Sequence, residues 1–161
     1  MSGLATLAPN ATDAEFDKLI DRSKPLGSGT TRNVFEMRGD PTLVIKEMKE
    51  PFPIANVTEW IIWGAVRKMA DDIMGNTPNA ETQNLFAKCH NISQSGKYLI
   101  MERLSPLKVT DTIVRSAFPD WINDSKRDAY GWSADGTMKV MDYAMIDFYE
   151  VLNPKNRTSP F

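Results

Sequence analysis

The chain contains one cysteine and one histidine among its 161 residues, and this scarcity excludes several kinds of protein. A single thiol, Cys89, cannot form an internal disulfide, and it leaves a zinc site short of thiolate ligands. The histidine, His90, follows it directly. Because neighbouring residues on a strand point to opposite faces, we expect two ordinary strand residues here and no catalytic dyad.

Excess charge and long apolar segments are also lacking. The 19 basic and 21 acidic side chains leave a formal net charge of −2, which argues against a nucleic-acid binder that works by bulk charge. No segment approaches the roughly 20 apolar residues that span a bilayer. Residues 1–10 lack the basic region that begins a signal peptide. We therefore expect a cytoplasmic protein with neither a membrane nor a nucleic-acid partner.

The composition that remains is that of a globular protein, with 42% hydrophobic and 25% charged residues. The length fits one domain, or two small lobes that share a core. The pattern predicts strands, a helix, strands, a short helix and a hairpin, which is an α+β order. The predicted helices cover residues 13–20, 54–73 and 108–117, with a short helix or loop at 121–128. The predicted strands form a meander over 24–48, a pair at 85–92 and 97–101, and a hairpin at 129–132 and 137–143.

A lysine interrupts the apolar pattern of the third predicted strand. Alternation places Val44, Lys46 and Met48 on one face, while the opposite face, with Leu43 and Ile45, is also largely apolar. We therefore expect a strand that is covered on both sides. An ammonium group on such a strand is costly unless a negative group meets it.

Glu59 is the candidate partner for Lys46. At helical spacing it lies on the same face as four apolar residues, Ile62, Val66, Met69 and Ile73. A first-turn glutamate can also be solvated and favoured by the helix dipole. Because Lys46 is thirteen residues earlier, on a strand that leads into this helix, we predict that the two form an ion pair. Removal of Lys46 should then leave Glu59 semi-buried and unpaired.

Glycines and isolated acids add two further signals. The turn Gly27-Ser28-Gly29 allows positive φ and close approach of backbone N–H groups to an anion, although a plain hairpin turn explains it equally well. It matches neither a Walker loop nor a Rossmann turn. Asp142 follows an apolar strand, where a carboxylate either caps a turn or holds a metal. Asp124 precedes it by eighteen residues.

Taken in order, these segments resemble the protein-kinase-like fold. Gly27-Ser28-Gly29 with Val34 is similar to the glycine-rich loop, Leu43-Val44-Ile45-Lys46 to the third-strand lysine motif, and Glu59 to its helix glutamate. Residues 98–104 resemble the fifth strand and hinge, and Asp142-Tyr143-Ala144 resembles the metal-binding Asp-Phe-Gly. The spacing from Asp124 to Asp142 suits the catalytic-loop aspartate. The resemblance implies an N-terminal arm at 1–23, a small lobe of antiparallel sheet and one main helix at 24–104, and a much reduced second lobe at 105–161.

The chain departs from the kinase pattern at several positions. Arg32 occupies the place of the third glycine, and no His-Arg pair precedes Asp124. The second metal ligand, an asparagine in kinases, falls on Ala129, although the neighbouring Asp128 is a substitute. Most of the lobe that holds peptide substrates is missing. The chain thus resembles a miniature kinase of phage type or a pseudokinase.

Two functions remain open. As an ATP- and Mg²⁺-dependent phosphotransferase, the chain would hold the nucleotide with Gly27, Ser28, Gly29, Val34, Val44, Lys46, Glu102 and Leu104, and the metal with Asp142 and Asp128. Glu59 would orient Lys46, and Asp124 would orient or deprotonate the acceptor hydroxyl. As a weak or inactive pseudokinase, a viral one included, it would bind and modulate a protein partner in the host cytoplasm. Trp60 and Trp63 would then form a surface patch, unless the fold covers them.

Overall fold

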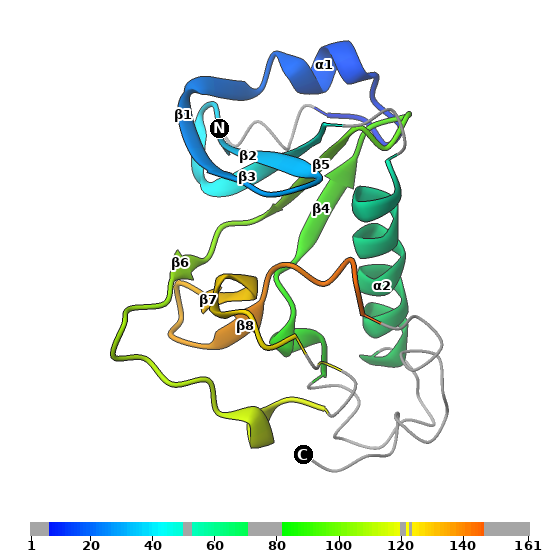
Figure 1. Ribbon diagram of the computed structural model, residues 1–161. Coiled ribbons are helices and arrows are strands. Elements are labelled where there is room, and N and C mark those ends of the chain that lie inside the picture. Colours follow the sequence, from blue (N-terminus) through cyan, green and yellow to red (C-terminus); the bar gives the residue numbers. More distant parts are fainter. Residues whose placement is uncertain (1–6, 50–52, 71–81, 120–121, 123, 147–161) are drawn as a thin grey trace. The chain divides into compact units, whose positions relative to one another are not determined.

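The computed structural model describes residues 7–49, 53–70, 82–119, 122 and 124–146 (Figure 1). The chain divides into two compact units. The first combines Met1–Trp60 with Lys88–Arg103, and the second combines Ile61–Ala87 with Leu104–Phe161. Among the described residues, helices are few and both sheets are antiparallel, which agrees with the predicted α+β class.

The first unit contains a five-stranded antiparallel sheet with the strand order β1-β2-β3-β5-β4 (Figure 1). Its strands are β1 (Ile20–Ser28), β2 (Arg32–Met37), β3 (Asp40–Met48), β4 (Cys89–Ile92) and β5 (Tyr98–Glu102). The predicted meander is therefore confirmed, with β1 beginning four residues earlier than expected. The order places β3 in the centre of the sheet, between β2 and β5.

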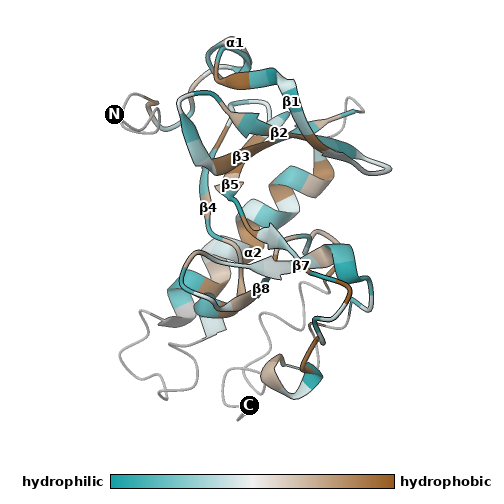
Figure 2. Cartoon of the chain, turned by 90° about the vertical axis from the view of Figure 1, so that its left-hand side faces the viewer, coloured by the Kyte–Doolittle hydropathy of each residue, from teal (hydrophilic) through white to brown (hydrophobic). Residues whose placement is uncertain are grey.

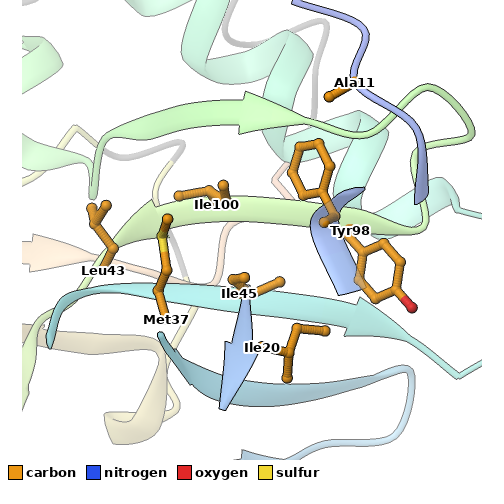
Figure 3. Packing of buried hydrophobic residues seen from close by; sticks show 8 residues of the cluster. Ala11, Ile20, Met37, Leu43, Ile45, Tyr98 and Ile100 are labelled. Carbon is orange, nitrogen blue, oxygen red and sulfur yellow. The ribbon is translucent and has the colours of Figure 1, made fainter. Parts of the chain in front are cut away.

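One face of this sheet carries an apolar core. The buried cluster consists of Ala11, Phe16, Ile20, Met37, Leu43, Ile45, Tyr98 and Ile100 (Figure 3). Phe16 belongs to α1 (Asp13–Asp17), a short helix that Thr12 and Glu15 begin with a capping box. The Phe16 ring stacks on Tyr98, with 6.2 Å between the ring centroids. The residues before β1 thus close this face of the sheet.

The opposite face of the sheet carries Lys46. Directly opposed residues of an antiparallel pair lie on the same face, and Lys46 stands opposite Val34 on β2 and Leu99 on β5. Arg32 stands opposite Met48 at the next paired position of this face. Val44, Lys46 and Met48 are all buried, as are Leu43 and Ile45 on the other face. The prediction that β3 is covered on both sides is confirmed. Figure 2 shows the hydrophobic centre of the sheet in brown.

The main helix is α2 (Ile54–Ala70), and the division between the two units falls within it. Glu59, Ile62 and Val66 are fully buried, so the predicted common face of the helix is confirmed at these positions. The Met69 side chain and Ile73 lie outside the described residues. The beginning of α2 meets the β4–β5 turn closely: a Cβ added to Gly96, which has φ +79°, would lie 2.9 Å from side-chain atoms of Pro53 and Val57. Only glycine suits this position.

The second unit contains a three-stranded antiparallel sheet, β6 (Ser105–Pro106), β7 (Tyr130–Trp132) and β8 (Met138–Val140). The predicted hairpin over 129–143 is thus confirmed with shorter strands. In β7, a Cβ on Gly131 would approach the Ser105 carbonyl oxygen to 2.8 Å, so glycine permits the close pairing with β6.

The predicted helix over 108–117 is wrong. This segment is irregular, apart from a 3-10 turn at Arg115–Ala117. Its five β-branched residues, Val109, Thr110, Thr112, Ile113 and Val114, lower helix propensity. Asp111 also diverts local hydrogen bonding: its Oδ2 accepts from the Lys108 amide at 2.7 Å and from the Trp132 indole N–H at 2.9 Å. The irregular segment is therefore held to β7 by a side chain.

Two other boundaries differ from the sequence prediction. The strand expected from residue 85 begins only at Cys89, because Gln83–Leu85 forms a 3-10 turn and Phe86 forms an isolated bridge to Val140. The segment expected as a short helix or loop at 121–128 has a 3-10 turn at Arg127–Ala129, while residues 121 and 123 lie outside the described residues. Within the described part of the chain, no helix is long and apolar enough to cross a membrane.

Candidate functional site

The candidate site in the first unit is a buried cluster of charged residues from three elements. Lys46 lies near the end of β3, Arg32 is the first residue of β2, and Glu59 lies in the second turn of α2. Glu59 is 0% exposed, and Arg32 and Lys46 are each 6% exposed. Such burial is tolerated only where the charges are paired and hydrogen-bonded.

Both cations contact both oxygens of the Glu59 carboxylate. Lys46 Nζ lies 3.1 Å from Oε1 and 3.0 Å from Oε2. The guanidinium of Arg32 donates from one nitrogen to Oε2 at 2.6 Å and from the other to Oε1 at 2.9 Å. The predicted Lys46–Glu59 ion pair is therefore present, and a bidentate arginine pair accompanies it. The sequence did not predict that second pair.

The two cations determine the ionisation of Glu59. Burial by itself would raise the pKa of this carboxyl, because it penalises the charged form. Lys46 and Arg32 oppose burial through their charges and hydrogen bonds, and the pKa of Glu59 falls below its ordinary value of 4.5. The carboxylate is thus charged at neutral pH despite its complete burial.

Asn56, one turn before Glu59, connects the charged cluster to the sheet. Its Oδ1 accepts a hydrogen bond of 3.3 Å from Arg32. Its Nδ2 group donates to the carbonyl oxygens of Lys46, Gly96 and Lys97 at 3.2, 3.0 and 2.8 Å. Asn56 is fully buried, so these bonds satisfy a side chain that has no access to water. The first turns of α2 are therefore fixed to β3 and to the β4–β5 turn.

The presence of Arg32 corrects one expectation. The sequence predicted that removal of Lys46 would leave Glu59 unpaired, but the bidentate contact with Arg32 does not involve Lys46. One signal was available in the sequence. Arg32 lies two positions before Val34 and so shares the strand face that pairs with Lys46. An arginine there, beside a buried lysine, calls for a shared counter-ion.

The glycine turn joins β1 to β2 as a hairpin. Gly27 and Ser28 pair with Val34 and Asn33, and the Gly29 amide donates to the Arg32 carbonyl at 2.9 Å. Neither Gly27 nor Gly29 has positive φ, so the conformational freedom of these glycines is not used in this structure. A Cβ on Gly27 would meet nothing within 4 Å, which leaves the hairpin open to close approach. Lys49, which follows β3, contacts the tip of this hairpin. Its amide donates to Thr31 O at 2.9 Å and its ammonium group donates to Gly29 O.

The other residues assigned to the nucleotide are spread along the sheet and beyond it. Val34 is half-buried opposite Lys46, and Val44 is buried opposite Met101. Glu102 ends β5; its amide donates to Lys88 O at 2.8 Å and its Oε2 accepts from the Lys88 amide at 3.0 Å. Leu104 is buried and begins a segment of the second unit.

Asp124 lies in the second unit, on a loop held by its backbone. Its carbonyl oxygen accepts from the Tyr130 hydroxyl at 2.7 Å and from Arg115 at 3.2 Å. Arg115 also donates to Ile122 O at 2.7 Å and to the Tyr130 hydroxyl at 2.8 Å. The Asp124 carboxylate is half-exposed and accepts from the Lys126 amide at 2.9 Å. The loop is fixed while the carboxylate keeps contact with solvent.

Asp142 and Asp128 are exposed carboxylates of the same unit. Ala129, next to Asp128, is buried, and its carbonyl accepts from the amides of Met141 and Asp142 at 2.7 and 3.3 Å. The backbone of Asp142 is thus held against that of Ala129. Among the described residues, no group of three or more His, Cys, Asp or Glu side chains is arranged to hold a metal ion.

A groove of about 510 Å³ in the second unit borders Asp124. Its lining consists of Val109, Thr110, Asp111, Thr112, Ile113, Arg115, Asp124, Ser125 and Arg127. Arg127 braces the irregular segment, donating to the carbonyls of Asp111 and Lys108 at 2.9 and 2.6 Å. The arginines of this groove thus support its walls with their hydrogen bonds.

The remaining sequence hypotheses concern aromatic and sulfur-containing residues. Trp63 is 6% exposed and Trp60 is half-buried, so the fold covers most of the tryptophan patch considered from the sequence. On β4, Cys89 is buried and His90 is exposed, as expected for neighbouring strand residues. The Cys89 thiol lies 3.9 Å from the Glu59 carbonyl oxygen.

Comparisons with known proteins give a distant structural similarity. No protein-family model and no curated protein sequence matches the chain. Among solved structures, one similar chain is the pseudokinase DRIK1 (drought responsive inactive kinase 1), crystallised with ENMD-2076. The two chains share 10% sequence identity at a TM-score of 0.46, and the match covers 91% of this chain. This chain spans 65% of the length of that structure.

Proposed function

We propose that this protein is a minimal kinase-like nucleotide-binding protein. The observation that carries the proposal is the buried Lys46–Glu59 pair, which joins the central strand to the main helix beside a glycine hairpin. A lysine on a strand and a glutamate on the following helix, both buried and in contact, are what the kinase resemblance implies. The five-stranded antiparallel sheet and α2 are compatible with the small lobe of antiparallel sheet and one main helix that the resemblance implies.

The donors of the first unit fit a nucleotide phosphate. Lys46 supplies an ammonium group, which serves phosphates well as a point charge. The hairpin after β1 has space around Gly27, so its backbone would approach the phosphates closely. The Gly29 amide already donates to Arg32 O and the Ser28 hydroxyl to Asn33 Oδ1 at 2.9 Å, so in this proposal the Ser28 hydroxyl would exchange Asn33 for a phosphate oxygen. Val34 and Val44 would contact the base, and Glu102 and Leu104 would form the hinge.

The proposal extends to phosphoryl transfer from ATP. Asp142, with Asp128, would hold Mg²⁺, which when bound neutralises phosphate charge. Asp124 would orient the acceptor hydroxyl and take its proton. The bond from the acceptor oxygen to the γ-phosphorus then forms, the bond from that phosphorus to the ADP oxygen breaks, and ADP leaves. The exposure of Asp142 and the fixed backbone of Asp124 support these roles.

Two substitutions favour a second candidate, a pseudokinase that acts by binding a protein partner. Ala129 offers no side-chain ligand at the second metal position, and its buried carbonyl is occupied by two amides. Arg32 replaces the third glycine and uses its guanidinium within the protein. A viral protein of this kind, encoded by a phage, would act in the host cytoplasm.

Thermal unfolding with ATP tests nucleotide binding. We expect ATP with Mg²⁺ to raise the melting temperature of the wild type, and Lys46→Met to abolish that shift. Lys24→Met is the matched control, because Lys24 is an exposed lysine paired with Glu36 in the same unit. If ATP leaves the wild-type melting temperature unchanged at millimolar concentration, the nucleotide proposal is wrong.

Transfer of labelled phosphate from ATP separates the enzyme from the pseudokinase. We expect slow transfer, confined to autophosphorylation or hydrolysis, and a loss of roughly 10²–10⁴-fold in Asp124→Ala with nucleotide affinity retained. Ala129→Asn restores a metal ligand and should raise the rate. Equal silence of the wild type, Asp124→Ala and Ala129→Asn would favour the pseudokinase.

A further inference from the structure

Arg32 makes a more directional connection to Glu59 than Lys46 does. A guanidinium presents two parallel N–H groups in a planar fork that matches a carboxylate, whereas an ammonium is a compact charge without a preferred orientation. The contacts follow this difference: Arg32 donates at 2.6 and 2.9 Å, and Lys46 at 3.1 and 3.0 Å. Arg32 therefore fixes the orientation of the Glu59 carboxylate as well as compensating its charge.

Arg32 also satisfies a second buried group of α2. Its guanidinium donates to Asn56 Oδ1 at 3.3 Å, and Asn56 in turn holds three backbone carbonyls of the sheet. Loss of the Arg32 side chain would remove its contacts with both Glu59 and Asn56. Loss of the Lys46 side chain would remove its contacts with Glu59 but would leave Asn56 in place, because Asn56 contacts the Lys46 backbone.

The backbone of Arg32 closes the glycine hairpin. Its carbonyl oxygen accepts a hydrogen bond from the Gly29 amide. The amide of Lys49, the residue after β3, donates to the carbonyl oxygen of the residue before Arg32, Thr31. One residue thus completes the turn with its main chain and holds the helix with its side chain. A glycine at this position would do only the first.

We propose that Arg32 is a positioning residue that fixes α2 to the β1–β2 hairpin through Glu59 and Asn56. Lys46 then need not hold the helix, and its ammonium can leave Glu59 for an anionic ligand while α2 stays in place. Hairpin and helix respond together to a ligand that contacts either. The docking of α2 stands independently of the proposed function, and only the role of the released ammonium rests on it.

The first test compares three methionine variants by thermal unfolding. Arg32→Met should lower the melting temperature by roughly 8 °C and Lys46→Met by roughly 3 °C, since the first removes the Arg32 donor from the buried Asn56 Oδ1 as well as the shorter bonds to Glu59. Arg22→Met is the matched control, because Arg22 also joins two elements through Asp17 and Glu47 but is half-exposed. It should have the smallest effect. A larger loss in Lys46→Met than in Arg32→Met would overturn the proposal.

Amide hydrogen exchange gives a reading that general destabilisation would not produce. In Arg32→Met, the protection factors of amides in the first turns of α2 and in the β1–β2 hairpin should fall at least tenfold. The amides of the buried cluster that includes Phe16 and Tyr98 should keep the protection that global unfolding of the variant allows. Lys46→Met should leave both regions protected. Arg32→Lys retains the charge without the fork and should restore less than half of the lost protection. Full restoration by lysine would show that charge alone holds the helix.

Nucleotide affinity should rank the variants in the opposite order. Lys46→Met should lose at least tenfold in ATP affinity, and Arg32→Met should lose less than threefold. If the wild type binds no ATP, the proposed function fails, while unfolding and exchange still decide the role of Arg32. If Arg32→Met loses affinity as strongly as Lys46→Met, Arg32 binds the ligand directly and the release of Lys46 is wrong.

Discussion

The candidate site residues of the two units are held in different ways. In the first unit, Arg32, Lys46 and Glu59 are buried and contact one another through side chains. In the second, Asp124, Asp128 and Asp142 keep exposed or half-exposed carboxylates, and the loops of Asp124 and Asp142 are fixed through backbone carbonyls and amides. These three charges of the first unit are therefore part of its stability, whereas the three carboxylates of the second keep contact with solvent and with any ligand that approaches from it.

The same contrast exists within the first unit, between two glutamates. Glu36, like Glu59, accepts from one lysine and one arginine: Lys24 and Arg103 each approach it to 2.8 Å. The partners of Glu36 are 56% and 36% exposed, whereas those of Glu59 are each 7% exposed at the side chain. The two sets of contacts therefore contribute differently to stability. Water screens the ion pairs of Glu36 and can replace them, whereas it does not reach those of Glu59.

The largest effect is expected from Glu59→Gln. The amide leaves two buried cations without their carboxylate, which should cost about 3–5 kcal/mol of unfolding free energy. Urea unfolding followed by tryptophan fluorescence measures the loss. Glu36→Gln is the matched control and should lower the unfolding free energy far less, because water compensates its cations. Similar losses in the two variants would mean that burial does not distinguish these glutamates.

The second unit should respond to backbone packing more than to charge. Gly131→Ala forces a Cβ to 2.7 Å from Leu104 Cβ and 2.8 Å from Ser105 O, and we expect a loss of about 2–4 kcal/mol. Gly64→Ala in α2 meets nothing within 4 Å and should stabilise the protein by about 0.5–1 kcal/mol. Thermal unfolding of both variants checks this. If Gly131→Ala leaves the melting temperature unchanged, β6 and β7 can move apart without a loss of stability.

Acid should act on the first unit through Glu59. Its pKa is lowered in the folded protein, so the unfolded chain binds the proton more readily. The stability that Glu59 contributes is present above its ordinary pKa of 4.5 and is lost as pH falls below that value. Melting temperatures between pH 7 and pH 3 should decline less steeply below pH 4.5 in Glu59→Gln than in the wild type. Parallel curves would contradict this assignment.

The smallest effect on stability is expected from Asp142→Asn. The side chain is exposed, and the amide of residue 142 still donates to Ala129 O, so the melting temperature should change by less than about 1 °C. The Mg²⁺-dependent part of the ATP shift should nevertheless disappear. Asp135→Asn is the control carboxylate of the same unit, in the β7–β8 turn. If ATP stabilises the wild type equally with chelator and with Mg²⁺, Asp142 holds no metal.

The sequence predicted the first unit better than the second. A charged residue on an otherwise apolar face stands out in the sequence pattern. The pattern alone therefore identifies Lys46 and Glu59 and predicts that they form a pair. The irregular segment 108–117 gave no such signal. Its apolar residues have nearly helical spacing, but β-branching and the Asp111–Trp132 contact hold the backbone outside a helix. The acidic residues of the second unit are held through backbone amides and carbonyls. Every residue carries these groups, so the sequence gives no signal of which ones will meet.

By itself, the sequence determined the antiparallel meander, the buried face of α2 and the contact between Lys46 and Glu59. These features depend on periodicity, which is local, and on the cost of burying a charge, which demands a partner. Only the tertiary structure decided that Arg32 shares that partner and that Asn56 connects α2 to three carbonyls of the sheet. Those contacts join residues 10 to 41 positions apart. Their geometry depends on how strand, helix and turn converge, and no pattern along the chain records that convergence.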